Sequence, residues 1–119
     1  MINIKPTVVA ALKADATLTG LLGGQRVYFQ VSPNADEYPR ITYYELDNSG
    51  ALFADDVEQA SEIVIMVDVW SKTSTSAIAQ AVDNVMTGLG FEREAAPDLY
   101  ENDTKVHHKA IRYGIEKEI

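Results

Sequence analysis

The chain of 119 residues contains no cysteine and little positive charge. Without cysteine it can form no disulfide bond, no thiolate zinc site and no cysteine nucleophile. Ten lysines and arginines stand against eighteen aspartates and glutamates, which gives a net charge of −8. A surface with this acidic excess repels phosphate, which argues against a protein that reads the grooves of DNA or RNA.

Long hydrophobic runs are also missing. The longest, Val8–Leu12 and Ile63–Val67, fall far short of the roughly 20 apolar residues that span a bilayer. The first run is too short for a secretory signal peptide and ends at Lys13, so we expect synthesis in the cytoplasm and no membrane partner. Hydrophobic residues make up 46% of the chain, which fits a single domain over residues 1–119 with one core.

The charge is unevenly distributed along the chain. Residues 1–30 and 105–119 carry a small basic excess, whereas residues 31–62 carry eight acidic side chains against the single base Arg40. The acidic residues of the segment 47–62 are Asp47, Asp55, Asp56, Glu58 and Glu62. Two interpretations remain open for this segment, a solvated surface of loops and strand faces or a functional acidic patch.

Hydrophobic spacing predicts two main helices and one short helical segment. In residues 4–13, Ile4, Val8 and Leu12 recur every four residues. Residues 15–22 form the short segment, in which Asp15 can cap the start and Gly23 can end it. The strongest helix is predicted over 73–89, where one stripe contains Ile78, Ala81, Val82, Val85, Met86 and Leu89.

Alternating and β-branched residues predict strands at 26–30, 40–47, 62–70, 91–95 and 105–115. Turns are expected at 48–50 and 97–104, whereas residues 51–60 fit a loop tip, a flexible arm or a hairpin extension equally well. The predicted fold class is α+β, in a two-layer α/β arrangement. It has a mixed or antiparallel sheet of four to five strands, with two main helices packed on one face.

The strand 62–70 is largely apolar on both faces. Ile63, Ile65, Val67 and Val69 form one face, and Val64, Met66 and Trp70 share the other with Asp68. Two helices can cover only one face, and a large exposed apolar patch usually marks an interface. We therefore expect these three residues to contact another subunit or a partner. The alternative is a long curled hairpin that folds over them.

No group of residues indicates catalysis, a metal site or a cofactor. His107 and His108 are neighbours on a predicted strand, so they point to opposite faces and cannot easily share a metal ion. Asp55, Asp56 and Glu58 lack the spacing and the glycine of a calcium-binding loop. The glycine-rich segment 20–24 lacks the lysine of a phosphate-binding loop. We therefore expect a protein that is not an enzyme.

Four features follow one another in a distinctive order. The segment 12–24 leads into Arg-Val-Tyr at 26–28, and Tyr-Pro-Arg-Ile-Thr-Tyr follows at 38–43. Val-Asp-Val-Trp-Ser-Lys-Thr at 67–73 then precedes the helical sequence 77–86, and Tyr100 precedes the closing segment 105–113. Together these features resemble the tail-completion, or tail-to-head joining, proteins of long-tailed bacteriophages and prophages.

This resemblance implies a structural protein of the virion, similar in fold to tail terminators and made in the cytoplasm of a bacterial host. It implies a ring, expected to be hexameric, at the head-proximal end of the tail tube. The partners would be other copies of the chain, the head connector or adaptor, and the tail tube proteins. DNA would pass nearby without sequence-specific binding. The acidic segment 47–62 would then line the DNA path, or form a flexible loop that orders on docking.

Other functions predict different features. A small-ligand-binding α/β domain, or an enzyme of unknown type, would have a concave pocket with convergent polar groups. Nearer alternatives are a head-completion adaptor and a tail terminator proper, which would share the fold and the ring geometry.

Overall fold

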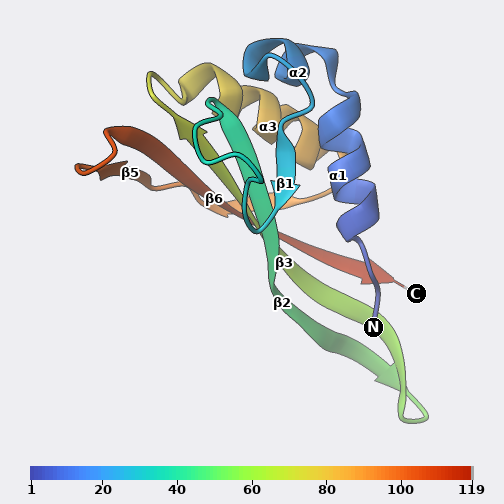
Figure 1. Ribbon diagram of the computed structural model, residues 1–119. Coiled ribbons are helices and arrows are strands. Elements are labelled where there is room, and N and C mark those ends of the chain that lie inside the picture. The colour runs from blue at the N-terminus through green and yellow to red at the C-terminus, as the bar shows by residue number, and fades with distance from the viewer. Residues whose placement is uncertain (119) are drawn as a thin grey trace.

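The secondary structure of the chain consists of three helices and six strands in the residues that the computed structural model describes, 1–118 (Figure 1). The predicted helices are confirmed, and Asp15 caps the second of them by accepting a hydrogen bond from the Leu18 amide. The elements are α1 (Lys5–Ala14), α2 (Ala16–Leu22), β1 (Val27–Phe29), β2 (Arg40–Ala54), β3 (Val57–Ser71), α3 (Ser76–Gly88), β4 (Glu92–Ala95), β5 (Asp98–Glu101) and β6 (Val106–Glu118).

The strands form one mixed sheet in the order β1-β2-β3-β6-β4, and β5 also pairs with β6. β1 runs parallel to β2 and all other pairs are antiparallel, so the prediction of a mixed sheet is confirmed. The predicted number of strands was too low. Residues 97–104 have the composition of a turn, but Asp98–Glu101 pairs with β6 because that strand offers a free backbone edge.

β2 and β3 are each 15 residues long and extend together beyond the rest of the sheet. The prediction of a turn at 48–50 was wrong, because Asn48, Ser49 and Gly50 pair with β3. The chain reverses instead at Asp55 and Asp56, whose φ angles of 51° and 62° suit a two-residue type I′ turn. Residues 51–60 are thus a hairpin extension.

The outer part of the β2–β3 hairpin, residues 46–59, which we call the arm, points away from the helices and is not folded over the sheet (Figure 1). The register of β2 against β3 shifts between Glu45 and Asp47. It shifts again once before Leu52 and once after it. Such bulges increase the twist of a hairpin and turn its edge away from the flat geometry that promotes aggregation.

The core lies between one face of the sheet and the three helices. The residues of β3 that were predicted for this face, Ile63, Ile65, Val67 and Val69, are all buried. They belong to one hydrophobic cluster with residues of every helix, among them Val8, Leu12, Leu18, Leu22, Ile78, Val82 and Met86. We call this side of the sheet the first face and the opposite side, which carries Val64, Met66 and Trp70, the second face.

A polar contact on the first face links α3 to β6 and β4. The hydroxyl of the buried Tyr113 donates a hydrogen bond of 2.9 Å to Asp83 of α3. Arg93 of β4 binds the other carboxylate oxygen of Asp83 at 2.8 Å. Burial, followed by the contact with Asp83, raises the pKa of Tyr113 well above its ordinary value.

We expect Tyr113→Phe to lower the free energy of unfolding by about 1 kcal/mol near neutral pH, because it removes one hydrogen bond and keeps the ring. A raised tyrosine pKa stabilises the fold below the unfolded value near 10, and this contribution is lost as the pH rises above it. Stability should therefore fall more steeply above about pH 10 in the wild type than in Tyr113→Phe. Urea unfolding measures both effects, with the exposed Tyr100→Phe as a control that should change neither.

Candidate functional site

The second face holds the three residues predicted to form an interface, and each of them is half-buried. Trp70 stacks on His108 with 3.7 Å between the ring centroids and an interplanar angle of 11°. Its indole nitrogen donates a hydrogen bond of 2.9 Å to the Thr42 hydroxyl. Met66 of β3 has Tyr44 of β2 as its cross-strand neighbour on one side and Arg112 of β6 on the other. The apolar groups of this face are therefore set among polar ones.

A buried carboxylate occupies the middle of the second face. Asp68 lies between Met66 and Trp70 on β3, and its Oδ1 is 2.7 Å from Nε2 of His108. The strand pattern places Asp68 on this face, but its burial and its contact with His108 were not predicted. Because alternate residues share a face, the strand that presents Val64, Met66 and Trp70 also presents Asp68, and its neighbours contribute Thr42, His108 and Arg112.

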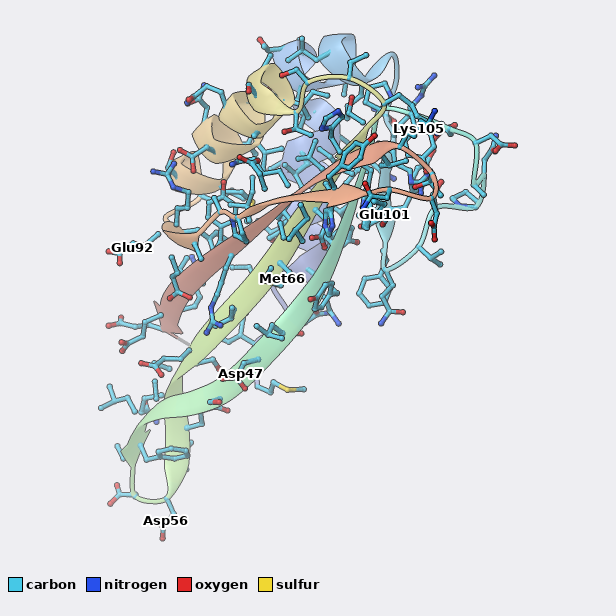
Figure 2. The ribbon with its side chains drawn as sticks, turned by 90° about the vertical axis from the view of Figure 1, so that its left-hand side faces the viewer. Asp47, Asp56, Met66, Glu92, Glu101 and Lys105 are labelled. Carbon is cyan, nitrogen blue, oxygen red and sulfur yellow. The ribbon has the colours of Figure 1, made fainter. Side chains whose placement is uncertain are left out.

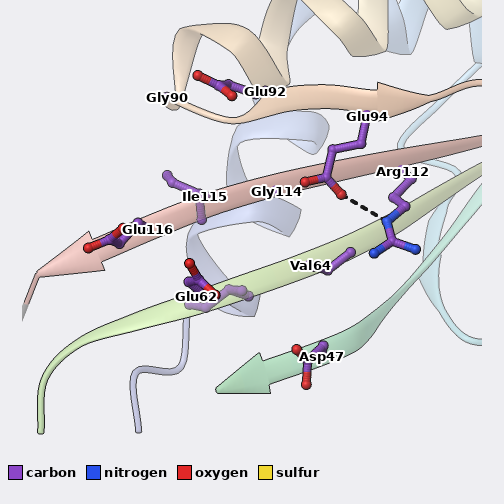
Figure 3. A pocket seen from close by; sticks show the side chains of 11 residues that line it. Asp47, Glu62, Val64, Gly90, Glu92, Glu94, Arg112, Gly114, Ile115 and Glu116 are labelled. Atoms are coloured by element: carbon purple, nitrogen blue, oxygen red, sulfur yellow. Dashed lines mark hydrogen bonds and ion pairs between the residues drawn. The ribbon is translucent and has the colours of Figure 1, made fainter. Parts of the chain in front are cut away.

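An acidic groove lies at the lower end of the second face, where β3 and β6 meet the start of β4 (Figure 3). Its volume is about 640 Å³. Val64, Asp47 and Glu62 meet here, so the groove joins one predicted interface residue to two residues of the predicted acidic segment. Further carboxylates come from β4 and β6, namely Glu92, Glu94 and Glu116.

Arg112 is the one basic side chain that lines the groove, and its Nε donates a hydrogen bond of 2.8 Å to Glu94. Glu94 lies across β6 at Gly114, where an added Cβ would collide with the carboxylate. Glycine at this position therefore lets β4 place its carboxylate over the neighbouring strand. With Arg112 already paired, the groove keeps a strong negative potential that repels anions.

The other acidic residues of the segment 47–62 lie on the arm. Asp56 is at its tip, far from Asp47 at its base (Figure 2), and Asp55 forms the same turn. Glu58 accepts a hydrogen bond of 2.8 Å from the amino group of Met1 and one of 2.7 Å from Ser61. These contacts lower the pKa of Glu58. Of the five acidic residues of this segment, Asp47 and Glu62 line the groove, Asp55 and Asp56 form the turn, and Glu58 is in an ion pair.

Exposed apolar side chains on the arm were not predicted. Leu52, Phe53 and Val57 are 53%, 60% and 59% exposed. The ring of Phe53 lies against Gly50, where an added Cβ would collide with it. The available sequence signal was the run of four apolar residues at 51–54 directly before Asp55-Asp56. None of the three interpretations of residues 51–60 used it.

A small apolar hollow lies on the first face, at the edge of the sheet. Its volume is about 360 Å³, and we call it the α1 hollow. Pro6 and Val9 of α1 form one wall, and Phe29 and Tyr43 form the other. Asn3 and Lys5 complete the lining. Sequence reasoning missed this feature because it depends on β1 ending opposite Tyr43.

The two histidines point to opposite faces of β6, so they do not lie together as a pair of metal ligands. His107 packs beside Tyr100, whereas His108 stacks on Trp70 on the other face, as the strand alternation predicted. No group of three potential ligands that could hold a metal ion occurs in residues 1–118. The helices described in that range also lack the length and hydrophobicity that a bilayer crossing needs.

The fold of this chain is similar to that of a protein in a solved virion structure. One chain in the solved structure of the virion of a native gene transfer agent (GTA) particle superposes with a TM-score of 0.76 at 18% sequence identity. The alignment covers 94% of this chain and 92% of that one. No match was found among the curated proteins. The family model described as tail completion protein gp17 matches residues 6–115. The chain therefore belongs to this family of tail completion proteins, which are structural proteins of the phage tail.

Proposed function

We propose that the protein completes the tail of a phage, prophage or gene-transfer particle and joins it to the head connector. It does so as a ring, expected to be hexameric, at the head-proximal end of the tail tube. The observation that carries this proposal is the family match over residues 6–115, nearly the whole chain. The fold shared with a chain of a gene transfer agent virion agrees with it.

The surfaces of the chain suit assembly and not catalysis. The second face combines half-buried apolar groups with paired polar ones, and the arm presents apolar side chains on a different part of the molecule. A chain with two different contact surfaces forms heterologous contacts, which close into a ring when the rotation between copies allows it. In this ring Met66 and Trp70 contact a neighbouring copy or the tail tube.

The acidic groove faces the path of the DNA in this arrangement. Asp47, Glu62 and Glu116 would repel the phosphate backbone, so that DNA slides past without binding. The same potential explains why a tail protein next to DNA carries a net charge of −8.

Removing the protein should leave heads and tails that cannot join. In a particle-producing cell that lacks the gene, we expect DNA-filled heads and separate tails, and purified protein added to the extract should restore complete particles. Electron microscopy counts the joined particles. Complete, infectious or DNA-transferring particles in the absence of the chain would overturn the proposal.

A charge on the second face should block assembly. Met66→Glu places a carboxylate in a contact that is proposed to be dry, and an unpaired interfacial charge costs several kcal/mol. We expect joining to fall at least tenfold while the melting temperature stays near that of the wild type. Val31→Glu, at a residue that is 74% exposed and outside this face, is the matched control. If Met66→Glu joins normally, this face is not the contact.

Neutralising the groove should slow the movement of DNA. We expect the triple variant Asp47→Asn, Glu62→Gln and Glu116→Gln to eject DNA more slowly, most clearly at low salt, because its groove repels phosphate less. Time-resolved ejection from intact particles measures this, and Asp36→Asn, on an exposed loop away from the groove, serves as the control. An unchanged ejection rate would remove the groove from the DNA path.

A further inference from the structure

We propose that the arm of one copy docks on α1 of the next copy, with Phe53 and Leu52 against the α1 hollow. This inference rests on the proposed ring and names the contact that holds its neighbouring subunits together. It commits the hollow to one occupant, a second copy of this chain.

The arm presents apolar surface that its own chain leaves exposed. Leu52, Phe53 and Val57 surround the turn at Asp55-Asp56, and each is more than half exposed. The cross-strand pairs Leu52↔Ala60 and Ala54↔Val57 hold this surface in place up to the turn. An apolar group displayed at the end of a paired hairpin is suited to insertion into a partner.

The α1 hollow offers a matching apolar surface. Phe29 and Tyr43 lie 5.6 Å apart between ring centroids at a tilt of 57°, and Phe29 is 46% exposed. A third aromatic ring beside such a pair gains the edge-to-face contacts that aromatic groups prefer. The hollow's 360 Å³ equals the liquid volume of about a dozen waters, which leaves room for the Phe53 ring.

The arm and α1 also carry opposite charges. Between Arg40 and Lys72 the chain has no basic residue, and the turn beside Phe53 carries Asp55 and Asp56. Residues 1–14 have no acidic residue, and α1 carries Lys5 and Lys13. Lys5 lies at the hollow itself, with its Nζ 5.2 Å from the centre of the Phe29 ring and 3.5 Å from a carboxylate oxygen of Glu45. This complementarity favours the acidic arm of another copy over a basic or neutral partner segment.

The arm cannot enter the hollow of its own chain. The hollow adjoins Tyr43 at the base of the hairpin, whereas Phe53 lies ten positions further along β2. At about 3.3 Å for each strand residue, Tyr43 and Phe53 are roughly 30 Å apart along β2. The contact must therefore form between copies, and because its two surfaces differ it is heterologous, as a ring requires.

The absence of cysteine makes a direct cross-linking test possible. Two single variants, Ala54→Cys on the arm and Asn3→Cys at the hollow, keep every apolar residue of the contact. We expect a short bis-maleimide to join the two variants into covalent dimers when they are mixed at high concentration, and into oligomers when one chain carries both changes. Asn102→Cys, in the exposed turn before β6, replaces Asn3→Cys as the matched control.

Two further variants separate the proposed contact from chance collisions. Phe53→Ser should lower the cross-linking yield at least tenfold, whereas Val31→Ser, at another exposed apolar residue, should leave it unchanged. Changing Asp55 and Asp56 to Lys should also lower the yield. A partner that carries Lys5→Glu and Lys13→Glu should restore it, because the swap re-creates opposite charges.

A yield no higher than that of the Asn102→Cys control, both in solution and in assembled particles, would overturn the proposed contact. If the contact is overturned in this way but rings are still seen on the tails, the proposed function is unaffected. Particles that join heads to tails without this chain would overturn the function itself, so the two failures are distinguishable.

Discussion

The structure depends on β3, because this strand is paired with β2 on one side and with β6 on the other. Its alternate residues Ile63, Ile65, Val67 and Val69 form the floor on which all three helices pack. A shift of one residue in this register would turn that floor to the second face and place Glu62 and Asp68 under the helices instead. The register therefore fixes both the core and the composition of the second face.

The same register connects the core to the proposed contact surfaces. β6 ends opposite Ala60, and beyond this point β2 and β3 continue as a two-stranded hairpin with no helix against which to bury Phe53 or Val57. The outer edge of β2 is free beyond Tyr43, and the α1 hollow lies beside this point. An apolar arm and an apolar hollow on one acidic chain agree with a protein whose stable state is an assembly.

Much of the fold followed from the sequence. The spacing of Ile4, Val8 and Leu12, the stripe of α3, and the central position of β3 were all predicted correctly, because period 3.6 and period 2 are local properties. The turn predicted at 48–50 failed because turn-forming residues can pair when a long partner strand is available. β5 was missed because residues 97–104 have the composition of a turn, although its partners on β6 are only 5 to 11 residues away in sequence.

The sequence by itself determined the charge, the lack of thiol chemistry, the helices and the inward residues of the central strand, all of which are set by residue type and local spacing. The tertiary structure alone decided that Asp47, Glu62 and Val64 share a groove with carboxylates of β4 and β6. It also decided that Asp68 is buried against His108, and that the arm stands clear of the sheet. These features depend on strand register and on where strands end, and both are set by contacts between segments far apart in the chain.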